Sequence, residues 1–339
     1  MPDLVTTLPQ DDLARYWSAV SRGDDDEAIA GALVLRNRGV PLEQILNDLV
    51  VGAQLRVGEL WADNHWSVAR EHDATSVAEA VVGRLTDDLP EPATGPVLTV
   101  ACVEREWHAL PALVVAAVLR SAGRRVDFLG ASVTRDRLVD RIGETESDVV
   151  LLSASLTSSL PRLRREIEAV RRTGTPVLVG GRAFDPDGVR ASRLGATAYA
   201  ATAEAAIEQL DHLPRTVMPA QPLVHPAALE AAELADRTDE LARAVMAATD
   251  QAIGLSGGGE DALAPDDWRV VLATFVPHVV DSLIGALLTD DPTVMAETRT
   301  WLWDVLVRRG ADPRTSVALD DALASVLCER PEALRILHA

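Results

Sequence analysis

The sequence predicts a chain of three parts: a helical bundle, a parallel α/β domain and a second all-α domain. Residues 9–86 carry apolar residues at helical spacing throughout. Residues 95–211 alternate short apolar strands with amphipathic helices, and helical spacing returns from residue 227. The chain has 339 residues, of which 47% are hydrophobic, so each part is long enough to bury a core.

The first part, residues 1–92, is predicted to contain four helices. Pro41 stands at the entrance of the clearest one, where its missing N–H costs no hydrogen bond, and apolar residues follow it at helical spacing up to Val51. The run Leu89-Pro90-Glu91-Pro92 closes the unit. The helices are expected at residues 10–22, 26–37, 41–51 and 67–86.

The middle part, residues 93–213, is predicted to be flavodoxin-like. Its apolar runs are short and rich in β-branched residues, which is typical of buried strands. Because strands and helices alternate regularly, we expect a doubly wound parallel sheet. The strands are expected at residues 96–102, 125–129, 148–153, 176–180 and 197–200, with helices at 111–122, 134–144, 159–173 and 186–193.

A linker and a third part complete the chain. Residues 214–226 contain four prolines and predict a semi-extended connector. Residues 227–339 are predicted to be all helical, with one apolar stripe from Trp268 to Leu283 and another from Val294 to Val305. The run at residues 256–259 is predicted to be a loop that divides this domain.

Charge and composition exclude several function classes. The formal net charge is -20 and no lysine occurs, so we expect no direct DNA binding. The start of the chain lacks a secretory signal, and no stretch approaches the roughly 18 uncharged apolar residues that span a bilayer. The two cysteines, Cys102 and Cys328, lie far apart and favour a reduced, cytoplasmic protein.

The candidate site begins with Glu106-Trp107-His108, directly after the first strand of the sheet. In open α/β sheets, ligands bind at the carboxyl ends of the strands. A glutamate two residues before a histidine can accept its imidazole N–H, which fixes the tautomer and makes the other ring nitrogen more basic. His108 is therefore the candidate metal ligand, with Glu106 as its partner. An ordinary surface histidine is the alternative.

Two further features point to the same edge of the sheet. Ser153 and Ser155 follow the third strand and offer hydroxyl groups to a ligand, while Gly180 and Gly181 follow the fourth and allow backbone to approach closely. No second protein ligand lies near His108 in sequence. The pattern suits a metal whose remaining positions are filled by a macrocycle.

These residues resemble the cobalamin-binding domain of methionine synthases, mutases and light-sensing repressors. The usual loop in that family is Asp-x-His-x-x-Gly, and this chain has Glu106-x-His108-x-x-Pro111. Pro111 departs from the pattern, and Ser155 stands where the family motif would place leucine. The resemblance implies that His108 is the lower axial ligand of cobalt. It also implies that Ser153 or Ser155, with Gly180 and Gly181, lines the slot for the nucleotide tail.

The first helical part resembles the cap of the cobalamin photoreceptors. The stretch from Trp61 to His72 is similar to their Trp-x9-Glu-His signature, with Val68 and Glu71 on matching positions. The resemblance implies that Trp61 covers the upper axial group of an adenosylcobalamin or methylcobalamin, that Val68 and Glu71 seat that group, and that His72 is a candidate upper ligand. Ala62 stands where light-sensing repressors have a histidine, so a bis-histidine state would need His65 or His72 in its place. Ordinary bundle packing is the alternative for Trp61 and Val68.

The order of the three parts resembles the photocobilins, which add a globin-like domain that binds a bilin. The resemblance implies a biliverdin in the C-terminal helices. Trp268, Phe275, Trp301 and Trp303 are candidates for its slot, His278 flanks the slot, and the cations for its propionates are Arg299, Arg308 and Arg309. The alternative is a packed helical core at helical spacing. Cys328 is expected to be a small core residue.

The sequence thus leads to the hypothesis of a cytoplasmic light sensor that is not an enzyme. Light would break the cobalt–carbon bond, the cap would move, and a biliverdin would extend the response to red light. The output would go to an unknown signalling protein, and a homodimer is compatible with the chain. Two alternatives stay open: a bilin-free photoreceptor or antirepressor that acts through protein contacts, and a corrinoid methyl-carrier protein.

Overall fold

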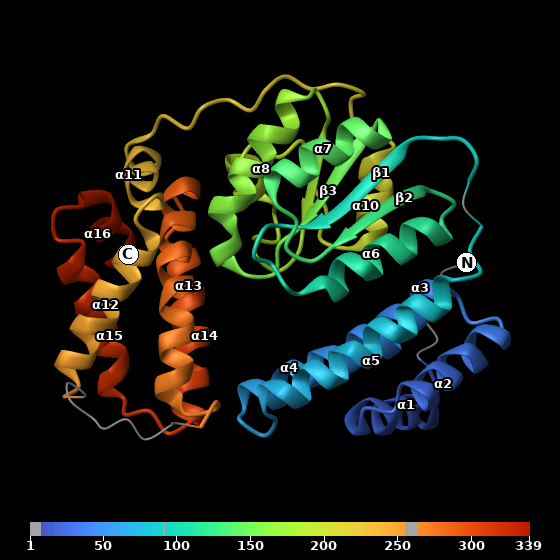
Figure 1. The fold of residues 1–339 in the computed structure, drawn as a ribbon, viewed down its shortest axis with the longest axis horizontal. Helices are drawn as coiled ribbons and strands as arrows, with labels where there is room; N and C mark the ends of the chain where they lie inside the picture. The colour runs from blue at the N-terminus through green and yellow to red at the C-terminus, as the bar shows by residue number, and fades with distance from the viewer. Residues whose placement is uncertain (1–7, 91, 255–263) are drawn as a thin grey trace.

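The computed structural model describes residues 8–90, 92–254 and 264–339, and Figure 1 shows their arrangement. A helical bundle lies beside one face of an α/β domain, and a second group of helices packs against the edge of that domain. The predicted loop at residues 256–259 lies outside the described residues.

The bundle consists of helices whose apolar faces meet in a core of their own. That core includes Ile45, Leu46, Leu49 and Val81, all fully buried. The predicted helix at 41–51 continues to residue 62, because no proline interrupts it, and its middle is π-helical. The elements are α1 Gln10–Arg22, α2 Asp25–Asn37, α3 Leu42–Gln44, η1 Ile45–Val51, α4 Gly52–Ala62 and α5 Val68–Thr86.

The predicted parallel α/β layout is confirmed. The strands follow the order β2-β1-β3-β4-β5 and every neighbouring pair is parallel, as in flavodoxin-like sheets. The strands are β1 Val97–Cys102, β2 Arg125–Gly130, β3 Val149–Ser153, β4 Val177–Gly180 and β5 Ala198–Tyr199. The helices are α6 Ala109–Ser121, α7 Arg135–Thr145, η2 Thr157–Ser159, α8 Leu160–Arg172, α9 Val189–Arg193 and α10 Ala203–Leu210, the last of which the sequence analysis missed.

The register of the sheet brings the candidate loops to one edge. Cys102 at the end of β1 pairs with Ser153 at the end of β3, and Ser153 pairs with Gly180 at the end of β4. The loops that follow these three strands therefore lie next to one another. The bundle packs on the same domain through α5 and α6, because Leu110 and Val114 of α6 belong to the bundle core.

The linker crosses the surface of the α/β domain before the last helices begin. The backbone N–H of Val217 donates to Gly174 O, and the guanidinium of Arg164 donates to Gln221 O, so the segment is tied to α8 and the turn after it. The helices that follow are α11 Pro226–Ala235, α12 Thr238–Ala252, α13 Trp268–Thr289, α14 Thr293–Arg308, α15 Arg314–Val326 and α16 Pro331–Leu337. A globin-like arrangement of these helices is not shown.

Helix α13 is the central element of the C-terminal part. It is long and apolar enough to cross a membrane by composition, although the sequence analysis expected no such stretch, but 67% of its most apolar window is buried inside the protein. It contacts α11, α12, α14 and α16 on one side and α8 and η2 of the α/β domain on the other. Its apolar character therefore serves packing within the fold.

A buried arginine anchors the C-terminal helices to the α/β domain. The side chain of Arg190 on α9 is 1% exposed, and its guanidinium forms ion pairs with Asp291 at 2.8 Å and Glu297 at 2.7 Å, at the start of α14. It also donates to Thr293 Oγ1 at 2.8 Å. Because a buried charge needs such partners, this contact fixes how the two parts dock. The domain boundaries at residues 92, 213 and 226 stay predictions.

Candidate functional site

A tight turn after β1 brings Glu106 and His108 together. Arg105 adopts the left-handed conformation (φ 64°) and donates its N–H to Ser132 Oγ at 3.0 Å, which turns the chain back. Glu106 is fully buried, whereas the side chain of His108 is 56% exposed. His108 Nδ1 lies 2.5 Å from Glu106 Oε1, so the ring is anchored at one nitrogen and free at the other.

The second carboxylate oxygen of Glu106 is bound by the segment after β3, residues 155–159, called here the serine loop. Glu106 Oε2 accepts from the N–H of Ser155 at 2.7 Å, the N–H of Leu156 at 3.1 Å and the hydroxyl of Ser159 at 3.2 Å. Burial by itself raises the pKa of Glu106. The hydrogen bond and charge of His108, with the two amides, outweigh burial, so the pKa lies below its ordinary value.

This carboxylate defines the tautomer of His108. Because an ionised carboxylate can only accept hydrogen bonds, Nδ1 carries the proton and donates it to Glu106. The hydrogen bond with Glu106 raises the pKa of His108; burial opposes this, and the charges of Glu106 and Glu71 raise the pKa further. Among the described residues, Nε2 has no protein hydrogen-bond partner. The ring therefore presents a basic, outward nitrogen, the form in which imidazole binds a metal.

The other predicted residues at the sheet edge surround this pair. The hydroxyls of Ser153 and Ser155 have no protein hydrogen-bond partner among the described residues, and both side chains are partly exposed. Gly181 has φ +111°, and a Cβ there would come within 2.3 Å of Ala154 O. A Cβ at Gly180 would meet Ala200 O at 2.7 Å. The two glycines are thus required by backbone packing, whatever ligand they face.

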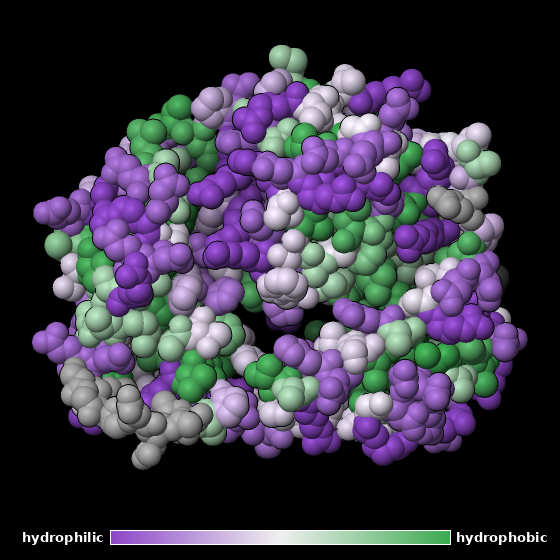
Figure 2. Space-filling view, in the orientation of Figure 1, coloured by the Kyte–Doolittle hydropathy of each residue, from purple (hydrophilic) through white to green (hydrophobic). Residues whose placement is uncertain are grey.

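The bundle supplies the opposite side. Val68, Glu71 and His72 begin α5, and Val68 and His72 are exposed. Glu71 lies close enough for its charge to act on His108, although they are 37 positions apart in the chain. Figure 2 shows the molecular surface hollowed where the bundle, the α/β domain and the C-terminal helices meet.

Trp61 from the end of α4 lies against aromatic residues of the C-terminal helices. Its ring centroid is 6.2 Å from Phe275 on α13 and 6.2 Å from Trp301 on α14, and the last two rings meet edge to face at 4.8 Å. His278 stands 5.5 Å from Phe275. Burial lowers the pKa of His278; the charges of Asp281 and Glu106 oppose this, and those of Arg162 and His108 add to it. These three residues of the proposed bilin slot therefore group with Trp61 and the candidate site.

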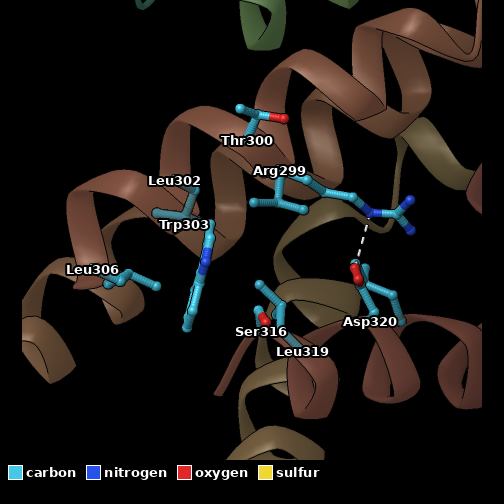
Figure 3. A pocket seen from close by; sticks show the side chains of 10 residues that line it. Arg299, Thr300, Leu302, Trp303, Leu306, Ser316, Leu319 and Asp320 are labelled. Atoms are coloured by element: carbon cyan, nitrogen blue, oxygen red, sulfur yellow. Dashed lines mark ion pairs between the residues drawn. The ribbon is translucent and has the colours of Figure 1, made fainter. Parts of the chain in front are cut away.

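Arg308 and Arg309 also contact the end of α4, through Asp63 and Trp61, whereas Arg299 and Trp303 of the proposed slot lie elsewhere. A cavity of about 250 Å³ lies among α13, α14 and α15. Figure 3 shows Arg299 and Asp320 facing each other there, with Trp303 further along the cavity. Its volume is below the ~300–1,000 Å³ typical of ligand sites. The Arg299 guanidinium pairs with Asp320 at 2.8 Å. Trp268 makes no ring–ring contact with other aromatic residues of the described chain, and Cys328 is exposed rather than a core residue.

The sequence analysis overlooked two contributors to the site. Ser159 and the N–H of Leu156 bind Glu106, and the run Thr157-Ser158-Ser159 at a strand end was the available signal. Trp107 is 73% exposed beside His108, which is unusual for so large an apolar side chain.

Comparison with known proteins identifies what such a site holds. Residues 96–211 match the family model described as the B12 binding domain, and residues 12–86 match a second model with the same description. The first two parts of the chain are a B12-binding cap and a B12-binding domain. A corrinoid is therefore the group that this part of the chain binds.

The relatives found by comparison are named as corrinoid proteins. Dimethylamine corrinoid protein 1 of Methanosarcina acetivorans is 28% identical over 208 residues, which cover 59% of this chain and 96% of that protein. Dimethylamine corrinoid protein 3 of Methanosarcina mazei is 29% identical over 147 residues, 41% of this chain and 87% of that protein. The structure of the monomethylamine corrinoid protein of Methanosarcina barkeri aligns with a TM-score of 0.52 at 18% identity, over 60% of this chain and 99% of that one, which shows a shared fold.

These relatives correct the functional hypothesis. The prediction of a light sensor with a biliverdin is wrong, because the similar proteins are named as dimethylamine corrinoid proteins and not as photoreceptors. The structure gives a physical reason for the error. Phe275, His278 and Trp301 looked like a separate chromophore slot at helical spacing, but they pack beside Trp61 and the serine loop.

The residues present fit a corrinoid. The outward Nε2 of His108 has no protein partner among the described residues, and its Nδ1–H is held by a buried carboxylate. An imidazole held this way suits a cobalt ion whose four equatorial positions belong to the macrocycle.

Proposed function

We propose that this chain is a corrinoid methyl-carrier protein, which receives a methyl group on its cofactor and passes it to an acceptor. The observation that carries the corrinoid site of this proposal is the Glu106–His108 pair, with Nδ1 held at 2.5 Å and Nε2 without a protein partner among the described residues. When bound, the corrinoid supplies a cobalt that takes up and releases a methyl group. The names of the relatives support the methylated amines as the source of that group.

In this proposal His108 is the lower ligand, and Glu106 acts through it. The buried carboxylate keeps the proton on Nδ1, because five hydrogen-bond donors around its two oxygens favour the ionised form. With one proton held on Nδ1, Nε2 is the ring nitrogen left to bind cobalt, once any proton on it is released. Ser153, Ser155 and the two glycines would border the nucleotide tail.

The cap residues would cover the upper side of the cofactor. Trp61 and Val68 would exclude water with apolar surface, and Glu71 and His72 would offer polar groups at the rim. A carrier must let its partner reach the upper side, so the cap has to move during a transfer cycle. We infer that the partner is a separate methyltransferase that activates the methyl donor, and that this chain is the carrier and not the enzyme.

The test begins with binding of hydroxocobalamin to the full-length chain. Wild type is expected to retain one cobalamin through gel filtration and to show a spectrum in which a protein imidazole replaces the lower base. His108→Ala is expected to lose that spectrum, while His212→Ala, a change at an exposed histidine of the same domain, keeps it.

Transfer is then measured in the dark, after a chemical reductant has brought the bound cobalamin to Co(I), with labelled dimethylamine and a dimethylamine methyltransferase. Wild type should acquire the label on its cofactor, and His108→Ala should acquire it far more slowly. A loaded wild-type protein that takes no methyl group from methylated amines, methanol or methylated thiols with their methyltransferases contradicts the carrier function.

A further inference from the structure

The serine loop has two faces, and the second face is held by the C-terminal helices. Its inner face binds Glu106. On its outer face, Ser158 Oγ shares a hydrogen bond of 2.9 Å with His278 Nδ1 on α13. Thr157 Oγ1 lies 2.8 Å from Ser282 Oγ on the same helix and 3.1 Å from Thr298 Oγ1 on α14. Adjacent residues of one short turn thus contact the Glu106 carboxylate and the last third of the chain.

This contact is closely packed. A Cβ at Gly285 of α13 would come within 3.1 Å of the Leu160 side chain and 3.2 Å of Thr157 O, so the glycine lets the helix lie directly on the loop. Arg162, which follows the loop, forms an ion pair of 2.8 Å with Asp281 of α13, and both side chains are largely buried. The position of α13 therefore determines the position of the serine loop.

The same two helices also hold the cap. Phe275 lies one turn before His278 on α13, and Trp301 lies one turn after Thr298 on α14; both rings pack against Trp61. Arg309 stands 4.7 Å over the Trp61 ring and donates to Trp61 O at 2.8 Å and Ala62 O at 3.2 Å. One pair of helices thus touches the support of His108 from one side and the cap from the other.

We propose that α13 and α14 form a third wall of the corrinoid cleft, in which His278 is a positioning residue for the Glu106–His108 pair through Ser158. The inference rests on the proposed corrinoid site and extends it into a region that the B12-binding models do not reach. The proposed link runs from His278 to Ser158, through the serine loop to Glu106, and from Glu106 to His108. Loss of the His278–Ser158 hydrogen bond should therefore loosen the Glu106–His108 pair.

The test uses both ends of the first hydrogen bond. His278→Leu removes it from α13, and Ser158→Ala removes it from the loop. His278→Asn keeps a polar amide near the place of Nδ1 and is the conservative rescue. Thr274→Val is the matched control, because Thr274 is exposed on the same helix and its one hydroxyl bond to the described residues goes to Val270 O of its own helix backbone.

Each full-length variant is loaded with hydroxocobalamin and reduced to the Co(II) state. Electron paramagnetic resonance then reads the splitting that a coordinated imidazole nitrogen imposes on the cobalt signal. Release of the cofactor is followed by dilution into apo-protein trap. Circular dichroism establishes that each variant is folded before loading.

We expect His278→Leu and Ser158→Ala to show a mixture of imidazole-bound and unbound cobalt signals and to release cobalamin about tenfold faster, the ratio that corresponds to one neutral hydrogen bond. His278→Asn should recover most of the wild-type splitting, and Thr274→Val should match wild type. If wild type binds cobalamin through His108 but both variants keep its signal and release rate, the third-wall role is refuted while the carrier site stands. If wild type itself does not bind cobalamin, both proposals fall.

Discussion

The carboxyl group of Glu166, on α8, is buried beneath the loop that precedes Glu106. It makes the stability of the protein depend on pH, and a single substitution should remove this dependence. Glu166 is 1% exposed, and its Oε1 accepts the N–H of Glu104 at 2.8 Å. Its Oε2 is buried and has no hydrogen-bond partner within the described part of the chain. Burial raises the pKa of Glu166 from 4.5 to about 8, and the charge of Glu104 adds to the effect.

The sign and size of the effect follow from that pKa. Because the folded state holds the proton more tightly than the unfolded chain, stability is highest below pH 4.5 and falls as the pH rises towards about 8. Each pH unit in that window removes at most about 1.4 kcal/mol. Between pH 5.5 and 7.5, Glu166 should therefore take about 2.5 kcal/mol from the free energy of unfolding.

Glu166→Gln keeps an oxygen for the Glu104 N–H but cannot ionise. We expect the free energy of unfolding of the variant to be close to that of wild type near pH 5. The advantage of the variant should then be about 2–3 kcal/mol larger at pH 7.5 than at pH 5.5. Urea unfolding at four pH values, followed by circular dichroism, measures the difference. The control is Glu168→Gln on the same helix, where the side chain is 39% exposed and pairs with Arg164. Parallel pH profiles for wild type and Glu166→Gln would refute the reasoning.

Three further predictions concern the site and the docking of its walls. Glu106→Gln places an NH₂ group among hydrogen-bond donors, so we expect it to cost about 3 kcal/mol in the free energy of unfolding measured with urea. It should also lower the pKa of the His108 imidazole in an NMR titration, and an unchanged pKa would contradict the pairing. Arg190→Met leaves the acidic start of α14 unpaired; a loss of about 3 kcal/mol is expected, and a stability within 0.5 kcal/mol of wild type would show that the buried ion pairs do not anchor the helices. Trp301→Leu removes two ring contacts worth about 1 kcal/mol each, so trypsin should cut the cap near Arg70 several times faster, whereas Trp303→Leu, on the cavity side of α14, should leave that rate unchanged.

Local pattern was sufficient to predict most of the elements. The first strand was expected at residues 96–102 and lies at 97–102, and the first helix was expected at its observed bounds, 10–22. Both depend on periodicity within a dozen residues, which the chain carries whatever its neighbours are. The contact between Glu106 and His108 was equally predictable from their spacing, because two residues in one turn after a strand can contact each other without packing from distant parts of the chain.

The function could not be predicted from these motifs. The loop around His108 and the cap residues near Trp61 indicate a corrinoid, and this much the comparisons support. They do not tell one corrinoid protein from another, since the same lower ligand serves different chemistry. The light-sensing hypothesis depended on the order of the domains and on aromatic residues at helical spacing in the last third, where no specific motif occurs.

By itself, the sequence determined the helices, the parallel sheet and the carboxylate–imidazole pair at its edge, because hydrogen bonds and side-chain periodicity between near neighbours decide those features. Only the tertiary structure decided that Phe275, His278 and Trp301 turn towards Trp61 and the serine loop instead of enclosing a pocket of their own. An apolar stripe on a helix shows that something covers it but not what. Here the stripe packs against residues that are distant in the sequence. The close approach at Gly285 and the buried charge of Arg190 determine that packing.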